Sequence, residues 1–215
     1  LMPSIPAFFG ADGPMLSRQD YQVTVSPGDT SVKSGSPVVI LARFGQRVPS
    51  EVSLVFGPGD EQVQKTELTK NLEDPVFGGI IQQVSQNLFY HIEYEGKRTQ
   101  EYRISVYENP DLVRADAKIV YPSYTKLPEK VIVDTRQISA VEGSQVTLTF
   151  LLNKAVTTAR LVPKEGPALE LTVDAEHPNV YATSLTASQS QRYELKLTDA
   201  QGLTNEVPPR FSIEV

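Results

Sequence analysis

The stretch that indicates the fold is Gln191-Arg192-Tyr193-Glu194-Leu195-Lys196-Leu197-Thr198. Its apolar side chains alternate with polar or charged ones, which is the pattern of a β-strand with one buried and one exposed face. Asp199 and Gly202 follow and favour a turn that returns the chain antiparallel. A similar stretch, Phe89-Tyr90-His91-Ile92-Glu93-Tyr94-Glu95-Gly96, lies earlier in the chain. The sequence therefore contains this strand pattern twice.

The second half of the chain repeats the first at an offset of about 108 residues. The matching segments are Val32–Ser36 with Ala140–Ser144, Val38–Phe44 with Val146–Leu152, Tyr90–Ile92 with Tyr193–Leu195, and Tyr102–Val106 with Phe211–Val215. A chain of 215 residues is long enough for two domains of about 100 residues each. We predict an irregular segment over 1–20, a first domain over 21–107 and a second over 108–215. The short linker Tyr107–Asp111 contains no glycine.

Short strands follow one another through the first half, and no segment has a sustained helical period. The predicted strands are Tyr21–Val25, Pro37–Phe44, Glu51–Phe56, Gln62–Leu68, Val76–Val84, Phe89–Glu95 and Glu101–Val106. About seven strands at this spacing predict a Greek-key sandwich. The fold class is therefore all-β, with two tandem immunoglobulin-like (fibronectin III-like) seven-stranded β-sandwiches.

The doubled pattern also predicts the core. In immunoglobulin domains a disulfide joins strands B and F, but this chain has no cysteine. Phe150 and Leu195 take the two cysteine positions in the second domain, and Ala42 and Ile92 take them in the first. We expect apolar packing to replace the disulfide, more fully where Phe150 stands. Tyr193, like its counterpart in the first half, is expected to form a tyrosine corner at the start of its strand.

Composition excludes several classes of function. The net charge of −6 and the absence of a basic stripe argue against a nucleic-acid partner. The lack of cysteine removes thiolate nucleophiles and cysteine-based metal sites. No apolar run reaches the roughly 20 residues that a membrane helix needs, so a membrane would be reached only through segments outside this chain. We expect the chain to be a piece of a longer protein.

Residues that could carry chemistry are scattered. His91 should face solvent and His177 should lie in a loop, and neither has a second histidine at metal-ligand spacing. Glu108, Asn109, Asp111 and Asp116 near the domain junction suggest a calcium site, but the dense Asp-x-Asp runs of such sites are missing. We therefore expect no cofactor, no metal and no catalytic residue, and regard calcium at the junction as the open alternative.

The most distinctive motif is Tyr121-Pro122-Ser123-Tyr124-Thr125. Pro122 favours an extended conformation at Tyr121, so we predict an edge strand that bends as it crosses between sheets. The tyrosines either pack locally or form an aromatic platform for a sugar or peptide. An exposed, coplanar pair among Tyr121, Tyr124 and Phe77 would indicate the platform.

In the order and spacing of its motifs, the chain resembles a family of large bacterial membrane-anchored proteins with tandem immunoglobulin-like repeats and no assigned function. The motifs that carry the resemblance are Val25–Asp29, Val32–Ser36, Tyr121–Thr125 and Glu142–Ser144. The resemblance implies membrane helices outside this chain and sandwich domains on the periplasmic or extracellular side. It implies no catalytic residues.

We therefore expect a non-catalytic structural or protein-binding ectodomain of a larger bacterial envelope protein. Unpaired backbone groups on the edge strands would engage a protein partner by strand addition. The alternative is an accessory carbohydrate-binding module of a larger envelope enzyme. An enzyme acting alone is third, because no acid–base or nucleophile constellation is visible.

Overall fold

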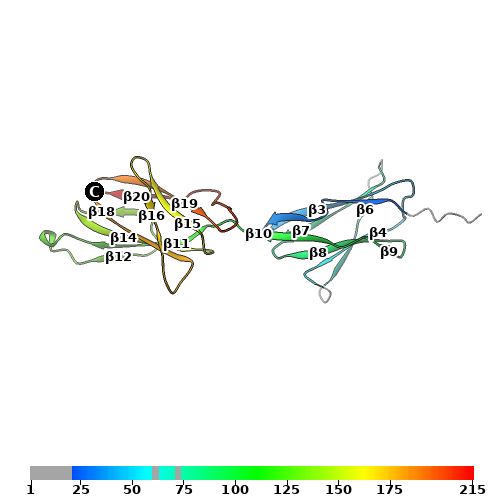
Figure 1. Cartoon of the computed structure of the whole chain (residues 1–215), viewed down its shortest axis with the longest axis horizontal. Coiled ribbons are helices and arrows are strands. Elements are labelled where there is room, and N and C mark those ends of the chain that lie inside the picture. Colours follow the sequence, from blue (N-terminus) through cyan, green and yellow to red (C-terminus); the bar gives the residue numbers. More distant parts are fainter. Residues whose placement is uncertain (1–20, 60–62, 71–73) are drawn as a thin grey trace, which may run out of the picture. The chain divides into compact units, whose positions relative to one another are not determined.

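The computed structural model describes residues 21–59, 63–70 and 74–215, and within them the chain is all-β (Figure 1). The described helical residues form a single 3₁₀ turn, η1 (Ser123–Thr125). The chain divides into two compact units between Tyr107 and Glu108. The segment 1–20, for which an irregular conformation is predicted, lies outside the described residues.

The first unit contains two sheets. One has the strand order β1-β3-β7-β6, made of β1 (Val23–Ser26), β3 (Ser36–Phe44), β7 (Val76–Val84) and β6 (Thr69–Lys70). The other has the order β2-β10-β8-β4-β5, made of β2 (Thr30–Lys33), β10 (Tyr102–Tyr107), β8 (Leu88–Tyr94), β4 (Val52–Gly57) and β5 (Gln64–Glu67). A short β9 (Lys97–Arg98) pairs with β8, and β2 runs parallel to β10.

The second unit has the same arrangement with two differences, since one strand is added and β9 has no counterpart. One sheet has the order β12-β11-β14-β18-β17, made of β12 (Lys130–Ile132), β11 (Leu112–Val120), β14 (Ser144–Leu152), β18 (Val180–Ala187) and β17 (Thr172–Val173). The other has the order β13-β20-β19-β15-β16, made of β13 (Gln137–Ser139), β20 (Arg210–Glu214), β19 (Gln191–Thr198), β15 (Thr158–Pro163) and β16 (Leu169–Glu170). The added strand is β12, which extends the first of these sheets beyond β11.

The two strand orders place β1, β3, β7 and β6 of the first unit in the positions of β11, β14, β18 and β17 of the second. In both units the last strand pairs in parallel with a short strand from near the start of the unit. The predicted all-β class is confirmed, and this division of strands between two sheets is typical of a β-sandwich. The described part of each unit forms ten strands rather than seven, because short edge strands carry no recognisable sequence pattern.

In the core of the first unit, aromatic side chains pack near the small residue Ala42. Ala42 pairs with Phe77 across β3 and β7, and both are buried. The Phe44 ring stands edge-on to Phe77 and to Tyr94, with centroids 5.6 and 5.2 Å apart. The bulk missing at Ala42 is therefore supplied by its cross-strand neighbour, which preserves dense packing without a disulfide.

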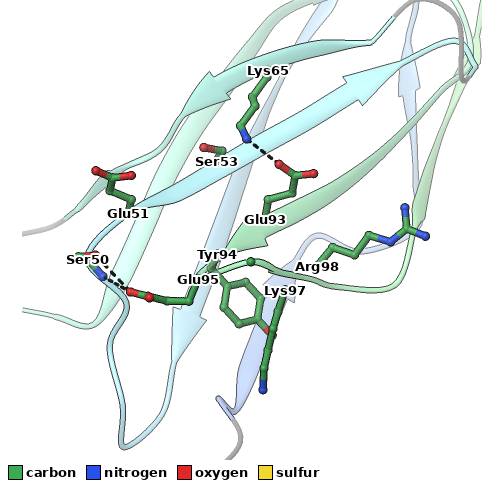
Figure 2. A pocket seen from close by; sticks show the side chains of 10 residues that line it. Ser50, Glu51, Ser53, Lys65, Glu93, Tyr94, Glu95, Lys97 and Arg98 are labelled. Carbon is green, nitrogen blue, oxygen red and sulfur yellow. Dashed lines mark hydrogen bonds and ion pairs between the residues drawn. The ribbon is translucent and has the colours of Figure 1, made fainter.

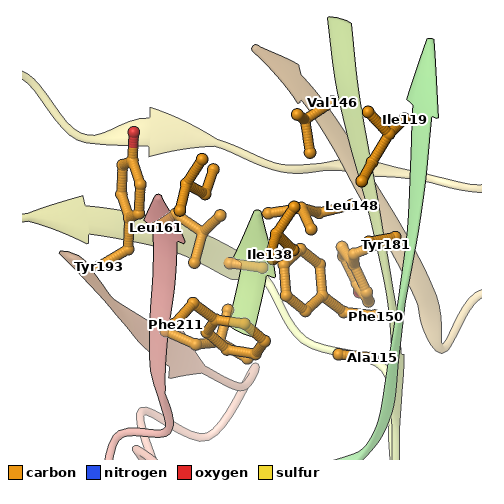
Figure 3. Close-up of a cluster of buried hydrophobic side chains, with 14 of the residues drawn as sticks. Ala115, Ile119, Ile138, Val146, Leu148, Phe150, Leu161, Tyr181, Tyr193 and Phe211 are labelled. Carbon is orange, nitrogen blue, oxygen red and sulfur yellow. The ribbon is translucent and has the colours of Figure 1, made fainter. Parts of the chain in front are cut away.

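In the second unit the position equivalent to Ala42 has a large side chain of its own, Phe150. Phe150 on β14 packs edge-on against Phe211 of β20, with ring centroids 5.2 Å apart, in the core that Figure 3 shows. Leu195 lies in the same cluster. All four residues predicted at the disulfide positions, Ala42, Ile92, Phe150 and Leu195, are fully buried, which confirms the predicted core.

The tyrosine-corner prediction is wrong in its hydrogen bonds. The Tyr90 hydroxyl donates to the carbonyl of Gly28, between β1 and β2, over 2.9 Å. The Tyr193 hydroxyl instead donates to the side chain of Gln191, over 3.1 Å. Neither bonds to the backbone a few residues upstream, as a tyrosine corner does. Both tyrosines are nevertheless buried core residues.

The edge-strand prediction for the Tyr121 motif is also wrong. β11 ends at Val120, and the motif forms the turn η1 instead. The backbone N–H and hydroxyl of Thr125 both donate to the Pro122 carbonyl, over 3.0 and 2.8 Å, and Lys126 adopts a left-handed φ of 55°. This hydrogen-bonded turn returns the chain to β12, which pairs with β11 in the same sheet.

Candidate functional site

The structure does not bring Tyr121, Tyr124 and Phe77 together as a platform. Phe77 is only 2% exposed and belongs to the core of the first unit. Tyr121 is partly buried against the core of the second unit. Tyr124 is 71% exposed, and its hydroxyl donates to the Glu142 carbonyl over 3.2 Å.

Phe77 is therefore corrected from a candidate ligand residue to a core residue. The reason is its register, since it stands opposite Ala42 and fills the space that this small side chain leaves. A strand residue that fills such a gap cannot also present its ring to solvent. Of the three predicted ligand residues, only Tyr124 exposes most of its ring.

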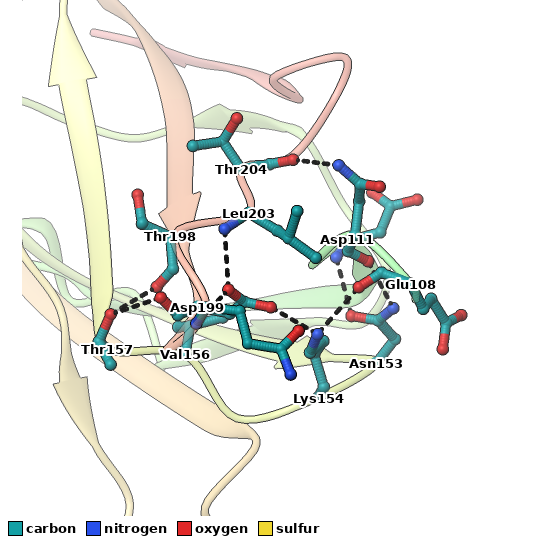
Figure 4. A network of polar contacts seen from close by, with 12 residues as sticks. Glu108, Asp111, Asn153, Lys154, Val156, Thr157, Thr198, Asp199, Leu203 and Thr204 are labelled. Atoms are coloured by element: carbon teal, nitrogen blue, oxygen red, sulfur yellow. Dashed lines mark hydrogen bonds and ion pairs between the residues drawn. The ribbon is translucent and has the colours of Figure 1, made fainter. Parts of the chain in front are cut away.

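The polar residues near the start of the second unit bond to backbone groups and side chains of that unit, part of which Figure 4 shows. The Asn109 amide donates to the Thr204 carbonyl over 2.7 Å, and the Asp111 carboxylate accepts the N–H of Leu112 over 2.8 Å. Asp116 accepts the N–H of Asp134 and pairs with Arg114. Across the described ranges, no three acidic or histidine side chains are grouped as metal ligands.

The positive charge in this hydrogen-bonded network is the ammonium group of Lys154. The Lys154 ammonium donates to a carboxylate oxygen of Asp199 over 2.6 Å and to the Glu108 carbonyl over 2.9 Å, as Figure 4 shows. The other Asp199 oxygen accepts the N–H groups of Gln201 and Leu203. The Lys154 hydrogen bond and the two backbone hydrogen bonds hold the pKa of Asp199 below its usual value, although burial opposes them. Asp199 thus orders the loop that leads from β19 toward β20.

A polar basin lies on the outer side of the first unit's second sheet, where β8 and β9 meet (Figure 2). It has a volume of about 540 Å³. Lys65 donates to Glu93 over 2.7 Å, and Ser50 donates through its N–H and its hydroxyl to Glu95. The hydrogen bond from Lys65 lowers the pKa of Glu93. Glu51 and Arg98 complete a lining of mixed charge, but the one aromatic ring, that of Tyr94, is buried.

The two histidines are far apart in the sequence and have different neighbours. His91 is on the outer face of β8, as its alternation with Tyr90 and Ile92 predicts, but its side chain is only 17% exposed. Its Nε2 lies 3.5 Å from a Glu93 oxygen. His177 lies in a loop, as expected, and its Nδ1 lies 3.0 Å from the Asp174 carboxylate. The His177 ring and two backbone N–H groups lower the pKa of Asp174.

An apolar surface lies on the outer side of the first unit's first sheet. Val39, Leu41 and Ile80, together called the outer apolar face, are 56%, 41% and 48% exposed. Val39 pairs with Ile80 across β3 and β7, and the Leu41 side chain lies over Gly78. Apolar side chains that neighbour one another on an exposed sheet face are typical of protein–protein contact sites.

The equivalent positions of the second unit are polar. Thr147 and Thr149 on β14 stand where Val39 and Leu41 stand on β3. Thr147 pairs with Ser184 across β14 and β18, and the two hydroxyls lie 2.9 Å apart in a hydrogen bond. The outer apolar face therefore belongs to the first unit and does not follow from the fold itself.

The sequence contains a pattern that indicates the outer apolar face, although the prediction of strands by alternation does not use it. The first-unit strand reads Pro37-Val38-Val39-Ile40-Leu41-Ala42, an uninterrupted apolar run. Its counterpart, Val146-Thr147-Leu148-Thr149-Phe150, alternates apolar and hydroxyl residues. A run without alternation in a strand indicates that both faces are apolar.

Comparison of the sequence with models of protein families gave no match, and comparison with curated proteins gave none either. Within the described ranges there is no helix with the length and apolar character needed to cross a membrane.

Proposed function

We propose that the chain is a non-catalytic, protein-binding β-sandwich module of a larger bacterial envelope protein, and that the first unit contacts the partner. The observation that carries this proposal is the outer apolar face. Val39 and Ile80 expose about half of their surface as a directly paired patch, whereas the second unit has a hydrogen-bonded Thr147–Ser184 pair in the same place. Exposed apolar pairs gain free energy when a partner removes them from water.

The placement in the bacterial envelope has separate support. It comes from the resemblance in motif order, which includes Val25–Asp29 and Tyr121–Thr125. On this proposal, residues outside the chain anchor the protein, and the two sandwich units present binding surfaces on the far side of the membrane.

The test uses a pair of substitutions that copies one unit onto the other. The double variant Val39→Thr/Leu41→Thr gives β3 the outward residues of β14. Immobilised wild-type chain is expected to capture proteins from bacterial envelope extracts, and the double variant should retain about one tenth or less of that material. The matched control, Thr147→Ser/Thr149→Ser in the second unit, should capture as much as wild type.

Two results would count against the proposal. One is capture that the Val39→Thr/Leu41→Thr variant retains in full, and the other is no specific capture at all. A glycan array run in parallel addresses the alternative role as a carbohydrate-binding module. Glycan binding that is lost in Tyr124→Ala would support that alternative, since Tyr124 is the one predicted platform residue with a mostly exposed ring.

A further inference from the structure

One edge of the first unit's first sheet is only partly covered. β6 pairs with β7 at two positions, Thr69 with Gly78 and Lys70 with Phe77. On its other side β7 pairs with β3 as far as Val84. Within residues 21–59, 63–70 and 74–215, no strand pairs with Gly79–Val84 on the side away from β3. Since strand residues direct their N–H and C=O groups alternately to the two sides, this segment presents unpaired donors and acceptors at the sheet edge.

A groove lies directly beside this edge. It has a volume of about 580 Å³ and is lined by β4 and β5 on one side and by β7 with the turn after it on the other. Phe56 and Ile80 provide most of its exposed apolar surface, and Ile81 and Leu88, which are 4% and 7% exposed, line it from the core. Glutamines at four positions, among them Gln82 and Gln83 of the edge itself, provide its polar groups.

The chemistry of the groove identifies what fits it. None of its twelve described lining residues is ionisable, whereas the polar basin of the same unit contains glutamate, lysine and arginine side chains. A charged side chain would lose hydration in the groove without gaining an opposite charge from these residues. Glutamine amides both donate and accept, so they match the peptide groups of an extended backbone.

The groove is continuous with the outer apolar face, because Ile80 belongs to both. An open edge is present in the second unit as well. There β17 pairs only with Tyr181 and Ala182 and leaves the rest of β18 without a partner strand. There, however, the outward side chains are Ser184 and Thr186, which bond to neighbouring Thr147 and Gln145. The combination of an open edge, an uncharged groove and adjoining apolar surface is found in the first unit.

We infer that Gly79–Val84 of β7 and the adjoining groove bind an extended, uncharged segment of a partner protein by strand addition. The segment lies beside β7 in line with β6, which occupies the same edge at Phe77 and Gly78. Its backbone pairs with the free edge of β7, and alternate apolar side chains enter the groove against Phe56 and Ile81. This inference rests on the proposed protein-binding function and specifies its site and the chemistry of its ligand.

The test uses a phage-displayed library of random linear peptides, selected on the full chain. Enriched peptides are expected to have apolar residues at alternate positions and no charged residue in the segment that binds. A synthetic enriched peptide should protect the amides of Gly79–Val84 from hydrogen exchange. Gln82→Lys and Gln83→Lys, at exposed positions outside the outer apolar face, should each weaken its binding about tenfold or more. The matched control Thr186→Lys, on the corresponding edge of β18, should leave the affinity unchanged.

Three results would overturn the inference: enrichment of charged peptides, no enrichment at all, or peptide binding by both lysine variants that equals binding by wild type. These results are separable from failure of the proposed function. If envelope proteins are captured through Val39 and Leu41 but peptides never protect Gly79–Val84, the strand-addition site is wrong and the protein-binding role stands. If neither probe binds the first unit, both proposals fail.

Discussion

The two units of this protein have the same strand order but distribute their side chains differently. In the first unit, the central part of β3 is apolar on both faces, and the small Ala42 stands where immunoglobulin domains carry a cysteine. In the second, β14 is apolar inside and hydroxyl-bearing outside, and Phe150 stands at that position. One sheet arrangement therefore accommodates two solutions of core packing and two kinds of outer surface. The comparison shows that this strand arrangement does not determine whether the outer face is apolar or polar.

The largest expected effect comes from placing a charge in the core of one unit only. Leu195→Asp should unfold the second unit, because a buried carboxylate without a partner costs about 4 kcal/mol or more. The first unit should still unfold cooperatively. Amide resonances of the two units, followed by NMR during denaturation, measure this. Lys196→Asp, the exposed neighbour, is the control, and a folded second unit in Leu195→Asp would contradict the core assignment.

Changing the volume of the core residue should destabilise both units, by removing bulk in the second and by adding it in the first. Phe150→Ala leaves a cavity against Phe211 and should destabilise the second unit by about 3–5 kcal/mol. Ala42→Phe adds bulk opposite Phe77 and should destabilise the first unit by about 1–3 kcal/mol, since that space is already filled. Urea unfolding of each variant gives the two values. A stabilising effect of Ala42→Phe would show that Phe77 does not compensate for Ala42.

A buried tyrosine makes the first unit sensitive to alkaline pH. Burial raises the pKa of Tyr90 from 10.0 to about 12. Because the folded pKa is the higher one, this contribution to stability is complete below pH 10 and is lost as the pH rises from 10 toward 12. Urea unfolding of the first unit between pH 9 and 12 should show the loss, and Tyr90→Phe should lack this component. An unchanged pH dependence in Tyr90→Phe would contradict the assignment.

An acid-sensitive ion pair belongs to the second unit. The pKa of Asp199 lies below 3.8 in the folded chain, chiefly because of Lys154. Its contribution to stability is therefore present above pH 3.8 and is lost as the pH falls through the lower, folded value. Lys154→Met should destabilise the second unit at neutral pH and weaken its dependence on acid pH. Denaturation of wild type and variant at pH 7 and pH 3 measures this, with Lys118→Met as the control for a surface ion pair.

The smallest effect on stability is expected at the outer faces. Val39→Thr/Leu41→Thr should change the free energy of unfolding by about 0.5 kcal/mol or less per site, since the side chains are exposed. The reverse change, Thr147→Val/Thr149→Leu, should be equally mild but should increase the binding of a hydrophobic dye by the second unit. A large loss of stability in the first double variant would show that these residues serve the fold rather than a partner.

The sequence predicted best which residues are buried. It predicted least well which residues contact one another. Alternation in Val146–Leu152 and Gln191–Thr198 identified strands and their inward residues, because the two-residue period of a strand is local. The role of Phe77 could not be predicted in this way, since it depends on which residue stands opposite on β3. The turn at Tyr121–Thr125 was misassigned because side-chain and backbone hydrogen bonds to Pro122 outweighed the extended tendency of the motif.

The sequence by itself determined the all-β class and the core residues Ala42, Ile92, Phe150 and Leu195, because these depend on local periodicity. The tertiary structure alone decided which apolar residues remain outside the core. Val39 and Ile80 meet only because β3 and β7 pair in one register, and the edge of β7 is open only because β6 is short. Cross-strand neighbours and sheet edges arise from pairing between distant segments, so the candidate binding surface becomes visible only in the folded chain.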